Sequence, residues 1–164
     1  MASRFHAQLG ETFVLPEGQV QENTKLIPGT DGAKMSKSKN NIINIFLDDK
    51  KLRKQVMGIQ TDSTPMEDPK DPDTCNVFAL YTILGTSDVI AEMRANYEGG
   101  NYGYGTAKQA FYDLLITKFA IERERYNYYM NNFEEIDKAL TIGAEKAKII
   151  ANKVLHRVRE KIGY

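Results

Sequence analysis

The chain has 164 residues and carries 22 Lys and Arg against 22 Asp and Glu, so its formal net charge is zero. Its overall charge therefore does not indicate a partner class, and the distribution of charges matters more than their sum. One cysteine, Cys75, and two histidines, His6 and His156, exclude an internal disulfide and a zinc site built from His and Cys alone. We expect no protein-bound metal. No apolar run reaches membrane-spanning length, so we expect no membrane association and a cytoplasmic location.

The first forty residues predict few and short regular elements. A short helix is expected over Ala2–Leu9, with Gly10 ending it. Thr12–Leu15 is typical of a short strand, and a second extended piece is expected near Val20. These elements are too few to form a sheet with both faces covered, so we expect the tail of a larger α/β domain.

A glycine- and lysine-rich loop follows over Ile27–Asn41. It reads Ile-Pro-Gly-Thr-Asp-Gly-Ala-Lys-Met-Ser-Lys-Ser-Lys-Asn-Asn. Proline and glycine favour a loop over a helix or strand. Three lysines alternate with two serines, namely Lys34, Ser36, Lys37, Ser38 and Lys39. Such a cationic, hydroxyl-bearing loop suits contact with phosphate, whereas most Lys/Ser-rich loops are ordinary solvated turns.

From Asn41 onward the sequence predicts helices. An apolar cluster at Ile42, Ile43, Ile45, Phe46 and Leu47 is expected to anchor the loop to the core. Asp48 is a suitable N-cap for a helix from Asp49 to about Gln60. The proline-rich connector Thr61–Pro72 marks a boundary. Further helices are expected over residues 74–84, 87–97, 106–130, 133–142 and 144–161.

Caps and breaks are predicted for these helices as well. Asp73 or Thr74 is expected to cap the first, Asn132 and Glu135 to form a capping-box-like pair, and Gly143 to break or bend the final stretch. Residues 143–164 hold six Lys or Arg against two Glu. Lys146, Lys153, Arg157 and Lys161 share one helical stripe. This stripe fits either a phosphate-tracking surface for nucleic acid or an ordinary solvated helix face.

The pentapeptide Lys34-Met35-Ser36-Lys37-Ser38 is identical to the KMSKS signature of class I aminoacyl-tRNA synthetases. The whole chain resembles the C-terminal half of a bacterial-type tryptophanyl-tRNA synthetase. The approach to the signature, together with the segments at residues 61–63, 69–72, 103–108 and 143–147, is similar to that family in order. Lys39 departs from the aromatic residue of many relatives. The family's second ATP motif, of the His-Ile-Gly-His type, does not occur in the sequence.

The resemblance implies an enzyme that uses ATP with Mg²⁺ as a substrate to form tryptophanyl-adenylate and passes the amino acid to tRNA. The two signature lysines, Lys34 and Lys37, would neutralise phosphate charge, and Lys37 would act as the catalytic residue on the leaving pyrophosphate. Met35 would pack near adenine, and Ser36 and Ser38 would orient the loop. Lys108, Lys146, Lys153, Arg157 and Lys161 are the candidate tRNA contacts.

The expected fold class is mainly α, with a C-terminal helical bundle of the anticodon-binding type after a short α/β remnant that carries the loop. The predicted domains are residues 1–60, the catalytic remnant, and residues 61–164, the helical tRNA-binding module. The resemblance also implies a missing N-terminal nucleotide-binding half, a homodimeric full enzyme and an inactive isolated chain. A free-standing, catalytically dead RNA-binding or regulatory relative, and a helical interaction module whose basic stripe is incidental, remain alternatives.

Overall fold

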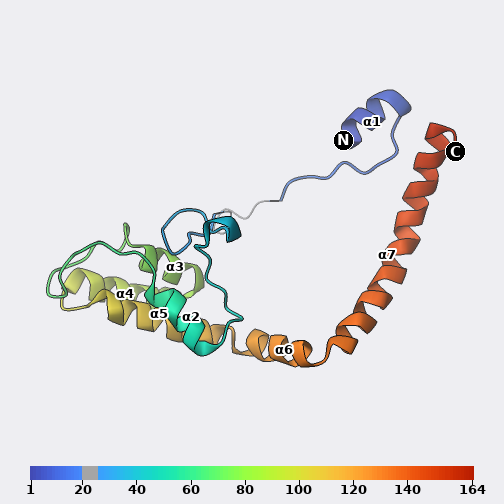
Figure 1. Ribbon diagram of the computed structural model, residues 1–164. Helices are drawn as coiled ribbons and strands as arrows, with labels where there is room; N and C mark the ends of the chain where they lie inside the picture. Colours follow the sequence, from blue (N-terminus) through green and yellow to red (C-terminus); the bar gives the residue numbers. More distant parts are fainter. Residues whose placement is uncertain (20–25) are drawn as a thin grey trace. The chain divides into compact units, whose positions relative to one another are not determined.

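The computed structural model describes residues 1–19 and 26–164 (Figure 1). The described residues form α-helices at Ala2–Leu9 (α1), Asp49–Met57 (α2), Asn76–Leu84 (α3), Ser87–Gly99 (α4), Tyr104–Lys118 (α5), Ala120–Asn131 (α6) and Phe133–Ile162 (α7), with a 3-10 helix, η2, at Lys37–Lys39. They contain no strand, only an isolated antiparallel bridge between Pro28 and Lys34. The predicted mainly helical class is therefore confirmed, whereas the α/β character expected of residues 1–60 is not found in the described part. The extended piece expected near Val20 lies outside it.

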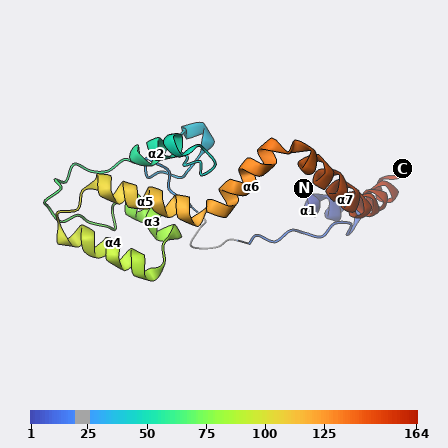
Figure 2. The same ribbon diagram turned by 90° about the horizontal axis from the view of Figure 1, so that it is seen from below.

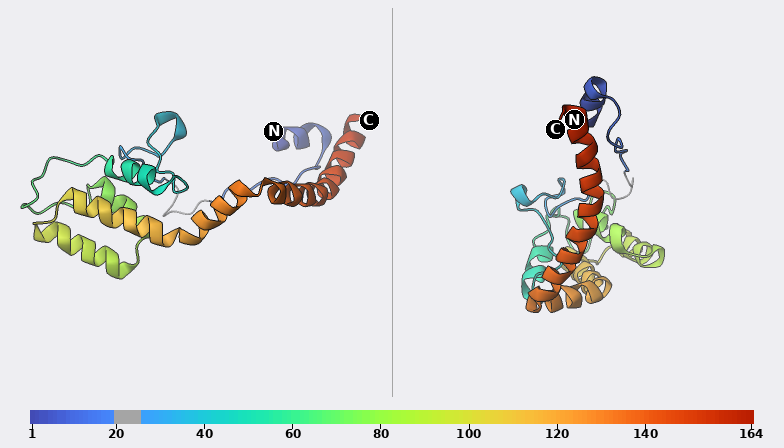
Figure 3. Two further views of the ribbon diagram at one scale, coloured as in Figure 1. Left: turned by 60° about the horizontal axis from the view of Figure 1, so that its bottom comes forward. Right: turned by 90° about the vertical axis from the view of Figure 1, so that its right-hand side faces the viewer.

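The chain divides into two compact units, and each is described by itself. The terminal unit comprises Met1–Val20 and Asn127–Tyr164, and the central unit comprises Gln21–Tyr126. Figures 2 and 3 show the elements of both units from other directions. Within residues 1–19 and 26–164, no helix combines the length and the apolar character needed to cross a bilayer.

The central unit holds the hydrophobic core. Helix α5 packs against both α2 and α3, and α4 packs against α3. The buried hydrophobic side chains are Leu52, Val56, Ile59, Cys75, Val77, Phe78, Leu80, Tyr81, Met93, Tyr97, Ala107, Phe111 and Leu115. Phe111 and Leu115 of α5 are 1% and 3% exposed. Of the cluster expected to anchor the loop, Ile43, Ile45 and Leu47 pack against this core.

The starts of α2 and α3 differ in how well the sequence predicts them. Asp48 caps α2 as predicted, because its carboxylate accepts a hydrogen bond of 2.9 Å from the Lys51 amide. The helix ends earlier than predicted, at Met57, before Gly58. The residue at the N-cap of α3 is Cys75, so the prediction of Asp73 or Thr74 is wrong.

The single helix predicted over residues 106–130 is two helices in the structure. Phe119 separates α5 from α6, with backbone angles of φ −104° and ψ 19° outside the helical region. Just beyond this break, the Arg123 guanidinium donates hydrogen bonds to the carbonyls of Ile45 and Leu47 and pairs with the Asp49 carboxylate. Arg123 therefore ties the chain segment before α2 to the first turn of α6.

In the terminal unit, α1 forms over the predicted residues but the predicted strand does not. The Nε2 atom of His6 accepts hydrogen bonds from the amides of Thr12 and Phe13, at 3.3 and 2.9 Å. The Phe13 ring also meets the Phe5 ring edge-on, with centroids 5.1 Å apart. The strand prediction for Thr12–Leu15 is wrong for this chain, because these contacts fold the segment back on α1 and no neighbouring strand is described.

Helix α7 runs without interruption through Gly143, so the predicted break is wrong. A glycine inside a helix costs only about 1 kcal/mol relative to alanine, which the flanking helical turns offset. The predicted capping box does not form either. Glu135 accepts a hydrogen bond of 2.6 Å from the Tyr128 hydroxyl, and the Asn132 side chain makes no cap bond to the helix.

Candidate functional site

The loop at residues 27–41 has an ordered, hairpin-like base. The Met35 amide donates to the Ile27 carbonyl at 2.8 Å, and the Gly29 amide donates to the Ala33 carbonyl at 2.7 Å. The isolated bridge between Pro28 and Lys34 lies between these two bonds. The two arms of the loop are therefore joined by backbone hydrogen bonds up to the first lysine of the signature.

The Asn41 side chain hydrogen-bonds the base of the loop. This side chain is buried, with 2% of the residue exposed. The amide nitrogen donates to Asp31 Oδ1 at 2.7 Å and to the Lys34 carbonyl at 3.2 Å, and the amide oxygen accepts from the Ser36 amide at 2.7 Å. Because one side chain bonds three points of the loop, the position of Lys34 and Ser36 depends on it. The sequence offered only the family pattern as a signal for Asn41, and its bonding role was missed.

The tip of the loop is a short 3-10 turn, η2, that carries two of the lysines. Asn40 closes it in the left-handed region, with φ 54°. The hydroxyls of Ser36 and Ser38 lie 2.9 Å apart, so one donates to the other across the start of the turn. All three lysines of the loop are exposed, and among the described residues none of them has an ion-pair partner within 4.0 Å. Their ammonium groups are available to an external anion.

Asp31 is the one acidic residue of the loop. The hydrogen bond from the Asn41 side chain lowers the pKa of the Asp31 carboxyl, and the Ala33 amide and the Lys39 charge act in the same direction. The carboxylate therefore stays ionised and serves as an acceptor for the base of the loop. With three lysines against one aspartate, the loop keeps an excess of positive charge.

The loop is also hydrogen-bonded to the segment that follows α2. The Gln60 amide donates to the Thr30 carbonyl at 2.7 Å. Gly32 has φ 76°, and a Cβ at this position would collide with the Asn76 side chain. Asn76 in turn donates to the Gln60 carbonyl at 3.0 Å. Position 32 therefore favours glycine for two reasons. Its backbone has a positive φ, and the Asn76 side chain leaves no room for a Cβ.

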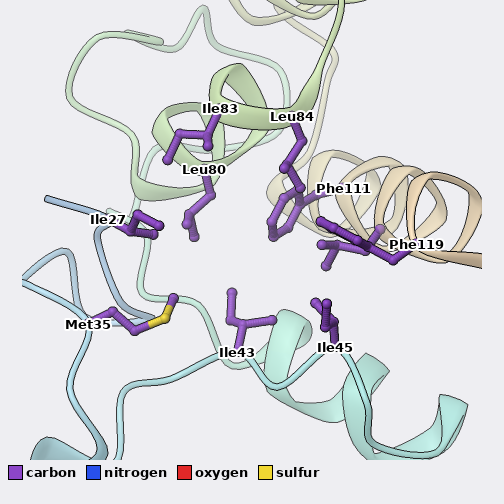
Figure 4. A pocket seen from close by; sticks show the side chains of 10 residues that line it. Ile27, Met35, Ile43, Ile45, Leu80, Ile83, Leu84, Phe111 and Phe119 are labelled. Atoms are coloured by element: carbon purple, nitrogen blue, oxygen red, sulfur yellow. The ribbon is translucent and has the colours of Figure 1, made fainter. Parts of the chain in front are cut away.

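The Met35 side chain points toward an apolar pocket below the loop (Figure 4). The pocket measures about 170 Å³ and is lined by Ile27, Met35, Ile43, Ile45, Leu80, Ile83, Leu84, Phe111, Leu115 and Phe119. The lining residues come from the loop, the segment before α2, α3 and α5, with Phe119 following α5. The thioether thus faces the helices of the central unit. The predicted contact of Met35 with adenine is not tested by this arrangement and stays a prediction.

The five residues predicted to bind tRNA fall into two sets. Lys108 lies on α5 and donates from Nζ to the Met57 carbonyl at 3.2 Å, at the C-terminal end of α2. Burial lowers the pKa of the Lys108 ammonium. The other four, Lys146, Lys153, Arg157 and Lys161, are exposed on α7 in the terminal unit. Among the described residues no group of three or more His, Cys, Asp or Glu is placed to hold a metal ion.

The chain is similar to known proteins in sequence and in structure. Residues 1–120 match the family of tRNA synthetases class I (W and Y). The chain is 40% identical to the tryptophan–tRNA ligases of Campylobacter jejuni and Rhodopirellula baltica, covering 99% of this chain and 51% of each relative. A crystal structure of the Campylobacter jejuni tryptophanyl-tRNA synthetase with ADP and tryptophan superposes with a TM-score of 0.88, again over 99% of this chain and 51% of that one.

The chain therefore belongs to the class I tRNA synthetase family that handles tryptophan and tyrosine. The relatives named above are tryptophan–tRNA ligases, and the chain spans about half of their length.

Proposed function

We propose that this chain is the C-terminal portion of a tryptophan–tRNA ligase and that its loop at residues 27–41 handles the phosphates of ATP. The observation that carries this proposal is the loop itself. Exposed Lys34 and Lys37 stand on a base that buried Asn41 holds in place. Cations positioned before the reaction stabilise developing phosphate charge without reorganising during it.

In the proposed reaction, a carboxylate oxygen of tryptophan attacks the α-phosphorus of ATP. The bond from that phosphorus to the bridging oxygen breaks, and pyrophosphate leaves with the bonding electrons. ATP arrives with Mg²⁺, which neutralises part of the phosphate charge. Lys37 would contact the leaving pyrophosphate, and Lys34 would contact the phosphate chain. An ammonium about 4 Å from one phosphate charge contributes about 4 kcal/mol before desolvation at an effective dielectric of about 20.

The remaining loop residues have supporting roles in this proposal. The paired hydroxyls of Ser36 and Ser38 orient the 3-10 turn that carries Lys37. Met35 packs near adenine when the loop closes on ATP, as the family resemblance implies. Such closure excludes water and completes the site, and reopening releases the products.

The helices would bind tRNA in the full enzyme. We retain the proposed domain division, with residues 1–60 as the catalytic remnant and residues 61–164 as the anticodon-binding type module. Lys146, Lys153, Arg157 and Lys161 carry an exposed positive charge suited to phosphates. Lys108 is the weakest of the proposed contacts, because its ammonium already bonds the Met57 carbonyl. The full enzyme would be a homodimer.

The proposal is tested in a chimera that joins the half of the Campylobacter jejuni enzyme not matched by this chain to residues 1–164. Tryptophan-dependent exchange of pyrophosphate into ATP is the readout. Lys37→Ala is expected to lower the exchange rate by about 100-fold and Lys34→Ala by about tenfold or more. Lys39→Ala is the matched control from the same turn and should change the rate less than threefold. Equal rates for all three variants would remove the catalytic role of Lys34 and Lys37, and a folded chimera without exchange would favour a catalytically dead RNA-binding relative.

A further inference from the structure

Met35 differs from the rest of the loop at residues 27–41 in the position of its side chain. It is the only sulfur-containing residue of the loop, and it is half-buried, whereas the three lysines of the loop are exposed. The Met35 amide donates to the Ile27 carbonyl at 2.8 Å, and the neighbouring Ser36 amide donates to Asn41 Oδ1 at 2.7 Å. The backbone is therefore held on both sides of the Met35 side chain, which points into the apolar pocket (Figure 4).

The pocket suits a thioether and does not suit a polar group. It measures about 170 Å³, and the other described side chains that line it are isoleucine, leucine or phenylalanine. None of these side chains can donate a hydrogen bond. A thioether is apolar and polarizable and packs well against such surroundings, whereas a polar atom without a hydrogen-bond partner is unfavourable there. The pocket therefore distinguishes between the reduced and the oxidised form of the Met35 side chain.

We propose that Met35 is a reversible oxidation site, at which a hydroperoxide converts the thioether to a sulfoxide and disables the loop. In this step a lone pair of the Met35 sulfur attacks one oxygen of hydrogen peroxide, and the O–O bond breaks. The second oxygen leaves with the bonding electrons as hydroxide and takes up the proton of the transferred oxygen, so the products are methionine sulfoxide and water. Sulfur loses two electrons and the peroxide gains them. A methionine sulfoxide reductase reverses the change, while two thiols become a disulfide and water is released.

The sulfoxide changes the loop because it no longer suits the pocket. Its oxygen requires a hydrogen-bond donor, so the Met35 side chain leaves the pocket or draws water into it. Lys34 and Lys37 lie one and two positions from Met35 in the sequence. A displaced Met35 side chain therefore alters how both ammonium groups meet a phosphate chain. This last consequence rests on the proposed function, to which it adds regulation by oxidation.

Two other methionines provide references for the reactivity of Met35. Met93 is 3% exposed in the core, and Met66 is 55% exposed on the connector before α3. Neither of them lines the pocket. Because oxidation of a side chain follows its exposure, Met93 reports the rate of a core methionine and Met66 that of an exposed one. Half-buried Met35, beside a pocket that is open to solvent, should react faster than Met93.

The test treats the full chain with hydrogen peroxide and follows each methionine by peptide mass spectrometry. Met35 is expected to oxidise at least tenfold faster than Met93. Once Met35 is fully oxidised, methyl NMR compares the pocket residues Ile43 and Ile45 with Ile149, which is exposed on α7. The Ile43 and Ile45 signals should move and the Ile149 signal should stay. Methionine sulfoxide reductase with a dithiol should then restore the original spectrum.

Two matched variants assign the effect to one sulfur. Met35→Leu keeps an apolar side chain of similar volume but has no sulfur, and Met66→Leu makes the same change at an exposed position. Peroxide should leave the pocket signals of Met35→Leu in place and should move those of Met66→Leu as in the unchanged chain. Oxidation of Met35 as slow as that of Met93, or pocket signals that stay in place after full oxidation of Met35, would overturn the proposal.

The effect on activity is measured in the chimera described above, and each sample is compared with its own untreated rate. Peroxide should lower pyrophosphate exchange at least tenfold, since misplacement of a binding group by about 1 Å can cost about 100-fold. The reductase should restore the rate, and the Met35→Leu chimera should lose less than twofold. An equal loss in Met35→Leu would overturn control through Met35. A chimera without exchange counts against the ligase proposal alone, because the methyl signals of the full chain decide the oxidation site.

Discussion

The side-chain amide of Asn41 donates a hydrogen bond of 2.7 Å to the Asp31 carboxylate, although ten positions separate the two residues. The same amide also bonds the Lys34 carbonyl and the Ser36 amide. The loop at residues 27–41 is therefore built on a buried polar contact beneath its exposed lysines. Hydrogen bonds among this chain's own residues hold the base of the loop.

Replacement of Asn41 by alanine should loosen the loop. The change removes three hydrogen bonds and leaves partly buried backbone groups unpaired, which costs about 1–3 kcal/mol. We expect tryptic cleavage after Lys34, Lys37 and Lys39 to become about tenfold faster. Asn127→Ala, at an exposed position on α6, is the matched control and should leave the rate unchanged. Slow cleavage in both variants would contradict the assigned role of Asn41.

The Asp31 carboxyl should make the loop sensitive to acid. Its pKa in the folded chain lies below the ordinary value, mainly because of the Asn41 hydrogen bond. The resulting stabilisation is present above about pH 3.9, the pKa of this carboxyl in the unfolded chain. It is lost as the pH falls through the lower pKa that the carboxyl has in the folded chain. A carboxyl carbon NMR titration should show the Asp31 pKa rising toward its ordinary value in Asn41→Ala. The Asp48 pKa, which Lys51 lowers, should stay unchanged.

Gly29 should tolerate no side chain. A Cβ at this position would lie 2.5 Å from the backbone oxygen of Asn41 and equally close to its side chain. Gly29→Ala is expected to lower the free energy of unfolding by about 1–3 kcal/mol, as other overpacked substitutions do. Gly105→Ala is the control, because a Cβ there meets nothing within 4 Å and alanine favours the helix. Urea denaturation measures the stability of both variants. Equal midpoints would contradict the predicted clash between a Cβ at position 29 and Asn41.

Arg123 should stabilise the junction between the segment before α2 and α6. Its guanidinium bonds two carbonyls and one carboxylate, and its side chain is only 15% exposed. Arg123→Met is expected to destabilise the chain by about 2–3 kcal/mol, because hydrogen bonds to a charged donor are lost. Arg125→Met, two positions away and exposed, should cost less than about 0.5 kcal/mol. Differential scanning calorimetry of the two variants compares them directly.

Local sequence signals predicted the elements whose causes are local. The Asp48 cap formed because a carboxylate three residues before the Lys51 amide needs no distant partner. The loop at residues 27–41 likewise followed from its glycines and proline. Features that depend on contacts across the chain were not predictable in this way. The three bonds of Asn41 and the contact of Gly32 with Asn76 emerge only when the segments come together.

The errors have physical reasons as well. Residues 12–15 have the composition of a strand, but strand formation depends on neighbours that the described chain does not supply. Gly143 was expected to break α7, but one glycine does not outweigh the propensity of the long helix around it. Phe119 is neither a proline nor a glycine, so the break between α5 and α6 was not predictable from local sequence.

Pyrophosphate exchange by the chain alone and by the chimera with the Campylobacter jejuni half is the most direct measurement of the central proposal. We predict no tryptophan-dependent exchange above background for residues 1–164 alone, because the loop then has no nucleotide-binding half to close against. The chimera should catalyse exchange, and Lys37→Ala should remove most of it. Robust exchange by the chain alone, or a folded chimera whose activity is indifferent to Lys37, would contradict the proposal.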